Sequence, residues 1–146
     1  MFWVPYLALL INLLIIWFMP KRLTNREIYT SWAVIALINL STDILLDLYF
    51  NLYELGGPGV QIRVHFIEIT LGASFGIIFL NFMPRKISAF VFYMAGWLVI
   101  SILFELLMVK VGFIHYTGWK IWYSVPYYIA AFSFVRWHLY FIRKDF

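Results

Sequence analysis

The chain has 146 residues, of which 64% are hydrophobic and 12% are charged, and its mean hydropathy of +0.88 excludes an ordinary soluble domain, in which about a quarter of the residues are charged. The absence of cysteine excludes a disulfide framework, a thiolate metal site and a catalytic thiol. The net charge of +4 comes from basic residues that are too few, and too close to apolar stretches, for nucleic-acid recognition. We therefore expect a single transmembrane domain over residues 1–146, with the lipid bilayer as its main partner.

Five apolar stretches are each long enough to form a membrane-spanning helix. A bilayer core of about 30 Å requires about 20 apolar residues in a helix, and the sequence meets this need at residues 2–19, 28–50, 62–82, 87–109 and 121–141. The stretches are continuous and do not alternate with polar residues, which favours helices over a barrel. The first stretch lacks the basic start and the cleavage site of a signal peptide, so we interpret it as a retained helix. We predict an all-α fold, a bundle of five transmembrane helices.

Basic residues in the connecting segments indicate the orientation. The first loop, the third loop and the C-terminus carry Lys21, Arg22, Arg26, Arg85, Lys86, Arg143 and Lys144. The opposite side has only Lys110 and Lys120 outside the helices and Arg63 at a helix edge. Cytoplasmic loops are enriched in Lys and Arg, so we expect the N-terminus outside, the C-terminus in the cytoplasm and a multi-pass protein of the plasma membrane. The similar segments "FMPKR" at 18–22 and "FMPRK" at 82–86 are interpreted as helix stops or, alternatively, as the trace of a two-helix duplication.

The second stretch carries a polar residue at every fourth position. Asn39, Asp43, Asp47 and Asn51 share one face of an α-helix, because residues four apart are neighbours on its surface. Each ionisable group inside a bilayer costs roughly 2.5–3.5 kcal/mol, so such groups persist where they are paired, hydrated or functional. We predict that this face points towards neighbouring helices and that Asp43 and Asp47 bind a ligand. Alternatively, they are structural partners of Arg63 or of backbone groups at a helix end.

The third stretch places His65 and Glu68 three residues apart, and Gly72 and Gly76 continue the same side. The small-residue pattern "GASFG" lets another helix approach closely, so Gly72 and Gly76 are predicted packing positions. A histidine with carboxylates suits zinc, manganese or iron, which makes His65 and Glu68 candidate metal ligands although there is no HExxH motif. Alternatively, His65 is a hydrogen-bonded anchor near a helix end.

The fourth stretch adds Ser101 and Glu105, four residues apart. With five spans, the acids and the histidine fall in the outer half of the bilayer, and the predicted ligand-binding or cation-binding residues are Asp43, Asp47, His65, Glu68 and Glu105. The residues predicted to support this pocket are Asn39, Arg63, Ser101, Tyr116 and Trp119. The sequence thus predicts a polar pocket that opens outwards, and it indicates no particular cofactor.

The last loop and the fifth stretch are rich in aromatic residues, among them Trp119, Trp122, Tyr123, Tyr127 and Tyr128. Such residues form an aromatic belt at a membrane surface or, alternatively, line a ligand site. Further along, Arg136 and His138 are expected to extend to the lipid headgroups.

The C-terminal part reads "FELLMVKVGFIHYTGWKIWYSVPYYIAAFSFVRWHLY", in which Glu105 precedes a G–F–Y–GW–W stretch and an arginine and a histidine follow near the end. Together with "TDILLDLYFNLYEL" and "FMPRK", this part resembles a family of small five-span membrane proteins of Bacillus- and Clostridium-type bacteria that is named only by a locus tag. The resemblance covers most of the chain. It implies a bacterial plasma membrane, and it carries over no catalytic residue.

Three hypotheses for the function follow. The first is a membrane protein whose outward-facing pocket of acids and His65 binds a cation, a proton or a small cationic or amphiphilic ligand. The second is a metal-dependent membrane enzyme that acts on a lipid or an isoprenoid, with the same residues as ligands and acid–base groups. The third is an interaction protein, either a homo-oligomer or a subunit of a membrane complex, whose polar residues hold helices together. The motifs GxxxxGK[ST], GxGxxG and GxSxG are absent, so the sequence indicates neither nucleotide nor serine-hydrolase chemistry.

Overall fold

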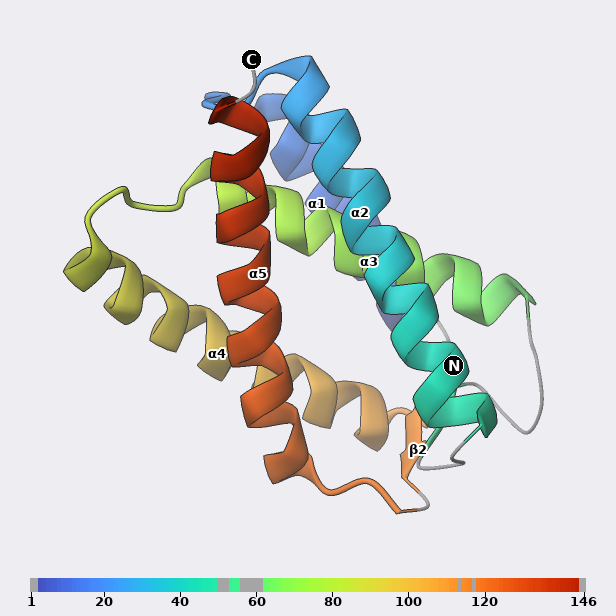
Figure 1. Ribbon diagram of the computed structural model, residues 1–146. Coiled ribbons are helices and arrows are strands. Elements are labelled where there is room, and N and C mark those ends of the chain that lie inside the picture. The colour runs from blue at the N-terminus through green and yellow to red at the C-terminus, as the bar shows by residue number, and fades with distance from the viewer. Residues whose placement is uncertain (1–2, 50–52, 56–61, 113, 117, 145–146) are drawn as a thin grey trace.

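The computed structural model describes residues 3–49, 53–55, 62–112, 114–116 and 118–144, and within them the chain is almost wholly helical. Five α-helices follow one another, namely α1 (Trp3–Phe18), α2 (Asn25–Asp43), α3 (Ile62–Asn81), α4 (Ile87–Lys110) and α5 (Ser124–Lys144) (Figure 1). Each helix overlaps one of the five predicted stretches. The prediction of an all-α class with five helices is confirmed.

The end of the second helix differs from the prediction. α2 stops at Asp43, and the chain continues as a π-helix, η1 (Ile44–Tyr49). A π-helix joins residues five apart where an α-helix joins residues four apart. The sequence had suggested that the four-residue polar pattern continues along one regular α-helical face. The change to a π-helix after Asp43 interrupts that face.

Two short strands and a 3₁₀ turn complete the described structure. The strands are β1 (Tyr53–Leu55) and β2 (Ile114–Tyr116), and they pair antiparallel with Tyr53 opposite Tyr116. The 3₁₀ turn η2 (Ile121–Tyr123) leads into α5. The small sheet was not predicted, and it joins the α2–α3 connection to the α4–α5 connection.

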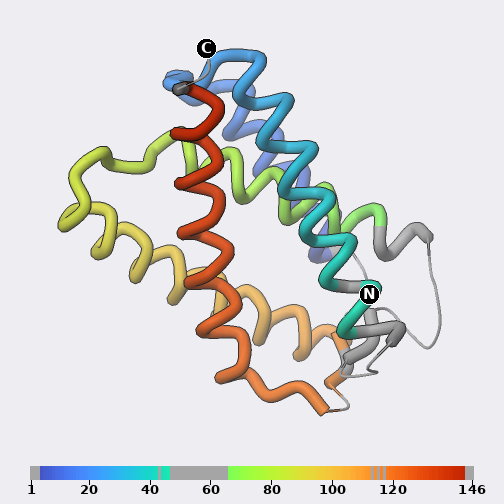
Figure 2. Tube along the Cα trace, in the orientation of Figure 1, coloured from blue at the N-terminus to red at the C-terminus, as the bar shows by residue number. Residues whose placement is uncertain are grey.

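α3 lies at the centre of the helix packing. α1 and α2 pack along it, α4 pairs with α5, and α5 also reaches α2 and α3. Figure 2 shows the turn between α1 and α2 beside the C-terminal end of α5, while the β2 segment lies at the opposite end of the molecule. The described part of the chain therefore has two distinct ends, which we call the α1–α2 end and the sheet end.

The core between α3, α4 and α5 is aromatic. Phe79 is fully buried, and its ring stacks on Phe132 of α5 with the centroids 4.6 Å apart. From α4, Phe90, Tyr93 and Trp97 approach the same ring at 6.1, 5.2 and 5.8 Å between centroids. Tyr93 also donates its hydroxyl to the backbone oxygen of Phe79 at 2.7 Å, so this contact anchors α4 to α3.

The glycines of α3 sit where α2 comes closest. A Cβ atom on Gly72 would lie 2.0 Å from Nδ2 of Asn39, and one on Gly76 would lie 2.4 Å from Cδ1 of Ile35. Both distances are far below van der Waals contact, so any side chain here would force α2 or its side chains to move. The two glycines thus occupy packing positions between α2 and α3.

Polar groups secure the α1–α2 end. Asn81 is 1% exposed, and its amide accepts from the backbone N–H of Arg22 at 2.7 Å and donates to the backbone oxygen of Pro20 at 3.0 Å. Arg143 at the end of α5 donates from Nε to Oε2 of Glu27 at 2.6 Å. These contacts join the ends of α3 and α5 to the turn between α1 and α2.

Arg136 has a structural role that the sequence did not predict. Its guanidinium donates to the backbone oxygens of Pro84 and Arg85 at 3.0 and 2.8 Å, and it lies 4.2 Å from the centroid of the Phe90 ring. The side chain therefore ties α5 to the α3–α4 connection, where the sequence had suggested an extension to lipid headgroups.

Much of the outer surface is apolar. On α4, the side chains exposed to solvent include Val91, Phe92, Val99, Ile100, Leu103, Leu106 and Leu107. Two helical stretches, Asn25–Leu46 and Ile87–Lys110, are long and apolar enough to cross a membrane by length and composition. Only 6% of the apolar window in the second stretch is buried, which is unlike the core helix of a soluble protein.

Candidate functional site

A cavity of about 250 Å³ lies between α2, α3, α4 and α5, and β2 contributes to its wall. Its aromatic lining residues are Phe75, Trp97, Phe104, Tyr116, Trp119, Tyr127, Tyr128 and Phe132. Its other polar lining residues are Asn39, Thr42, Glu68, Ser101, Glu105 and Ser124. Ligand sites in proteins are typically apolar cavities of about 300–1,000 Å³ with a few well-placed polar groups, so this cavity suits a small ligand.

Glu105 is hydrogen-bonded by three hydroxyl groups within the cavity. Tyr116 donates its hydroxyl to Oε2, and Tyr128 donates to Oε1 at 2.7 Å. The Ser124 hydroxyl lies 2.7 Å from Oε2 and 3.0 Å from Oε1, and it accepts from Nε1 of Trp119 at 2.9 Å. Each carboxylate oxygen thus has two hydroxyl neighbours.

The sequence brings these donors together through two local features. Gly112 follows the end of α4 with a φ of 86°, a conformation that glycine adopts readily at helix ends. The chain turns there and enters β2, which carries Tyr116 back to Glu105. Ser124 and Tyr128 are four residues apart in α5 and so lie on the same face of that helix.

Tyr116 is held in its protonated form. Burial raises the pKa of its phenol, and the hydrogen bond to Glu105 and the charge of that carboxylate raise the pKa further. The phenol therefore remains a hydrogen-bond donor throughout the physiological pH range.

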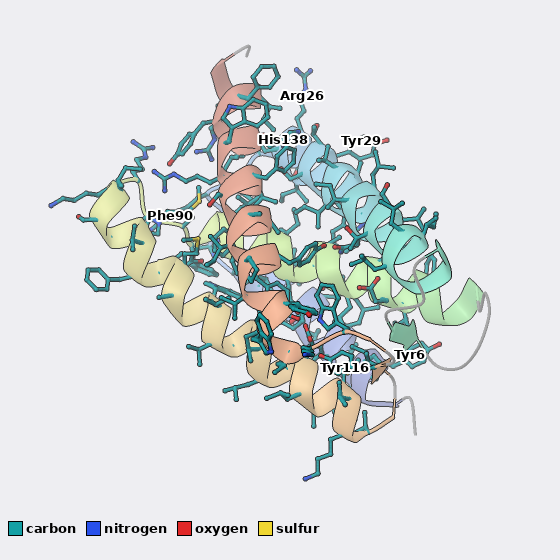
Figure 3. All side chains as sticks on the ribbon, turned by 60° about the horizontal axis from the view of Figure 1, so that its bottom comes forward. Tyr6, Arg26, Tyr29, Phe90, Tyr116 and His138 are labelled. Atoms are coloured by element: carbon teal, nitrogen blue, oxygen red, sulfur yellow. The ribbon has the colours of Figure 1, made fainter. Side chains whose placement is uncertain are left out.

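Figure 3 shows Tyr116 near the end of α4, far from Arg26 and His138 at the opposite end of the molecule.

The wall formed by α2 and α3 is also polar in part. The Tyr127 hydroxyl donates to Oγ1 of Thr42 at 3.3 Å, which ties α5 to α2 across the cavity. Asn39 lies against Gly72, and Glu68 of α3 also lines the cavity. Among the side chains that the structure describes, two carboxylates, Glu68 and Glu105, therefore line the same cavity.

The predicted site residues divide into two groups. The structure brings together Asn39, Glu68, Gly72, Gly76, Ser101, Glu105, Tyr116 and Trp119, which all line this cavity. The side chains of Asp43, Asp47, Arg63 and His65 lie outside the described residues. Among the side chains described, no group of three or more His, Asp or Glu residues is placed to hold a metal ion. The metal site at His65 and Glu68 stays a prediction.

Of the hydroxyl groups around Glu105, sequence reasoning named Tyr116 as a pocket residue and Tyr128 as a belt or ligand-site residue, but it did not name Ser124 and did not assign any of them to Glu105. Ser124 and Tyr128 are its donors from α5, and the available signal was their four-residue spacing beside a conspicuous acid. Of the aromatic residues near the start of α5, Trp119, Tyr127 and Tyr128 line the cavity, whereas Trp122 is 62% exposed. The cavity position of the first three is compatible with the ligand-site interpretation, and the aromatic belt stays a prediction.

Comparison of the chain with protein-family models, with curated proteins and with solved structures finds no match. The resemblance noted in the sequence stays a prediction.

Proposed function

We propose that the chain is an integral membrane protein that binds a small amphiphilic cation in the cavity between α2, α3, α4 and α5. Support for the membrane comes from the apolar outer surface of α4 and from the two helical stretches of spanning length. Large exposed apolar patches on a soluble protein would promote aggregation, and in lipid they are the expected surface.

We further propose five crossings of a bacterial plasma membrane, with the N-terminus outside. The exposed basic residues at the α1–α2 end are Lys21, Arg22, Arg26, Arg85 and Lys86, and such residues favour the cytoplasmic side. The sheet end, with the Glu105 side of the cavity, would then face outwards.

The chain has no cysteine, so single introduced cysteines test this orientation without background. We expect Lys120→Cys to react with a membrane-impermeant maleimide in intact cells and Lys21→Cys to react only after the cells are opened. Equal labelling of both positions in intact cells, or the reverse order, would refute the orientation.

The observation that carries the binding proposal is the environment of Glu105. Its carboxylate lies in a cavity that is lined largely by aromatic side chains. Among the described residues, its hydrogen-bond partners are hydroxyl groups, with no basic side chain among them. A carboxylate in an apolar site is costly unless an opposite charge accompanies it. A ligand with a positive charge and an apolar body would supply that charge and fill the aromatic part of the cavity.

Calorimetry on the protein in lipid discs, with empty discs as the blank, tests this function. The probes are benzylammonium, benzyldimethylammonium and benzyltrimethylammonium, and the neutral comparison is neopentylbenzene, which has the shape of the last cation without its charge. We expect at least one cation to bind about tenfold or more tightly than neopentylbenzene, a difference of about 1.4 kcal/mol.

The charge preference should depend on Glu105. We expect Glu105→Gln to reduce it to less than about threefold, while Glu27→Gln, which removes a carboxylate at the α1–α2 end, leaves it in place. The comparison of cation with neutral probe in the unaltered protein does not depend on how well any variant folds. Failure of all three cations to exceed the neutral probe would refute the binding function and favour a purely structural role for Glu105.

A further inference from the structure

We infer that the ligand is a single-chain amphiphile, with its cationic head at Glu105 and an unbranched tail of about eight carbons in the interior of the cavity. This inference rests on the proposed binding function and specifies the shape of its ligand. It follows from the way polar and apolar lining residues are distributed along the four helices.

Depth in the cavity can be followed along the sequence of each lining helix. α2 leads through η1 to β1, and α4 leads to β2, so later residues of both helices lie nearer to the sheet end. α3 and α5 run the other way and finish at the α1–α2 end (Figure 1). Later residues of α3 and α5 therefore lie farther from the sheet end.

Among the described residues, charged, amide and hydroxyl side chains line the part of the cavity nearer to the sheet end. α4 and α5 contribute Ser101, Glu105, Ser124, Tyr127 and Tyr128, and α2 and α3 contribute Asn39, Thr42 and Glu68. Beyond them, on all four helices, the lining residues carry no such group. This interior part is lined by Ile35, Gly76, Trp97, Ala131, Phe132 and Val135.

An amphiphile separates its charge from its apolar body in the same direction. The sheet-end part offers the Glu105 carboxylate, with hydroxyl and amide groups around it, to a cationic head. The described residues of the interior part offer no such group, and burying an unpaired polar group there would be costly. The interior part therefore suits an apolar tail that is attached to the head.

The interior part is long for the volume of the cavity. From Tyr128, which holds Glu105, to Val135, the lining residues of α5 cover about 10 Å of helix axis at about 1.5 Å per residue. An extended alkyl chain with bonds of about 1.5 Å and angles of about 111° advances about 1.25 Å per carbon, so about eight carbons span this length. The whole cavity holds about 250 Å³, which favours one unbranched chain over a branched body.

Two isomers test the shape of the tail in the unaltered protein. n-Octylammonium and tert-octylammonium have the same charge and the same number of carbons, but the branched isomer is too short to reach the interior part. Calorimetry in lipid discs, with empty discs as the blank and affinities referred to the free aqueous concentration, should show n-octylammonium bound about tenfold or more tightly. Equal affinities would overturn the inference.

A series of n-alkylammonium ions tests the length. From butyl to octyl, the affinity should rise by about fourfold for each added methylene that is buried, and it should change little beyond about eight carbons. Partition into the lipid of empty discs continues to rise with chain length, so the limit identifies the cavity. An affinity that does not rise between butyl and octyl would contradict a tail in the interior part.

Ala131→Leu places three more carbon atoms in the interior part, one turn beyond Tyr128. It should reduce the preference for octylammonium over butylammonium by about tenfold and leave the affinity for butylammonium within about twofold. Ala130→Leu is the matched control, because Ala130 is exposed on the same helix and does not line the cavity. A preference that survives Ala131→Leu, or that Ala130→Leu removes equally, would overturn the inference.

The two proposals fail in different ways. If the tail is wrong, the benzylammonium ions still bind better than neopentylbenzene and lose this advantage in Glu105→Gln. If the binding function itself is wrong, no benzylammonium ion exceeds the neutral probe, and the inference falls with it. The comparison of the two octyl isomers does not depend on the folding of any variant.

Discussion

Replacing Gly72 with alanine is expected to destabilise the packing of α2 on α3, whereas the same change at Gly96 is expected to stabilise α4. A Cβ atom on Gly72 would lie 2.0 Å from Nδ2 and 3.1 Å from Cγ of Asn39, so the whole Asn39 side chain would have to move. A Cβ atom on Gly96 meets nothing within 4 Å. The two glycines are both inside helices, and the comparison isolates the effect of contact.

The magnitude follows from two terms. Alanine is favoured over glycine inside a helix by about 1 kcal/mol, and this gain applies at both positions. Overpacking a filled interface costs about 1–3 kcal/mol, and this cost applies only at Gly72. The gain cancels in the difference, so the free energy of unfolding should be lower in Gly72→Ala than in Gly96→Ala by about 1–3 kcal/mol.

Titration of the purified protein with a denaturing detergent, with unfolding monitored by tryptophan fluorescence, measures this difference in unfolding free energy. Gly76→Ala should behave like Gly72→Ala, because its Cβ would lie 2.4 Å from Cδ1 of buried Ile35. Equal unfolding free energies for the Gly72 and Gly96 variants would refute the idea that the glycines of α3 are needed for close approach of α2.

Two further predictions concern the α1–α2 end. Asn81→Ala removes the partner of the Arg22 N–H and the Pro20 carbonyl, so it should lower the free energy of unfolding by about 2 kcal/mol. Hydrogen exchange of the Arg22 amide should become faster in this variant. An unchanged exchange rate would contradict the hydrogen bond between the Arg22 N–H and Asn81. Glu27→Gln keeps the hydrogen bonds of the helix cap but removes the charge that faces Arg143. We expect a loss of about 1 kcal/mol that shrinks at high salt, and a loss that is independent of salt would argue against an ion pair.

The helices could be predicted because each apolar stretch is long enough to dominate its own structure. The π-helix at Ile44–Tyr49 and the two strands could not. A strand of three residues such as Tyr53–Leu55 is too short for an alternating pattern, and it forms because a distant segment pairs with it. The sheet is thus a product of tertiary structure and leaves no local signal in the sequence.

The candidate site shows the same division between local and distant effects. Glu105 and Glu68 stood out because an acid inside an apolar helix is costly, and the structure places both on one cavity. The hydroxyl donors of Glu105 come from β2 and from α5. A serine and a tyrosine are ordinary residues at their own positions, so their role becomes visible only when the helices are packed.

The cavity itself follows from unequal spacing of the helices around α3. On one side of α3, Gly72 and Gly76 allow α2 to approach closely. On the other side, large rings keep the neighbouring helices apart. Phe75 meets Phe104 of α4 with the centroids 5.2 Å apart, and Phe79 stacks on Phe132 of α5 at 4.6 Å.

Rings that meet by their edges or faces separate helix axes more than small side chains do, and the space left beyond the rings is not filled. Glu105 lies where this space reaches the end of α4, and three hydroxyl groups donate hydrogen bonds to its carboxylate. A protein that needed only a stable bundle would be served as well by an apolar side chain at this position, because replacing buried ionic groups by well-packed apolar residues is often neutral or stabilising. The cost of keeping a carboxylate there, in a space large enough for a small molecule, is the physical reason to expect a charged ligand.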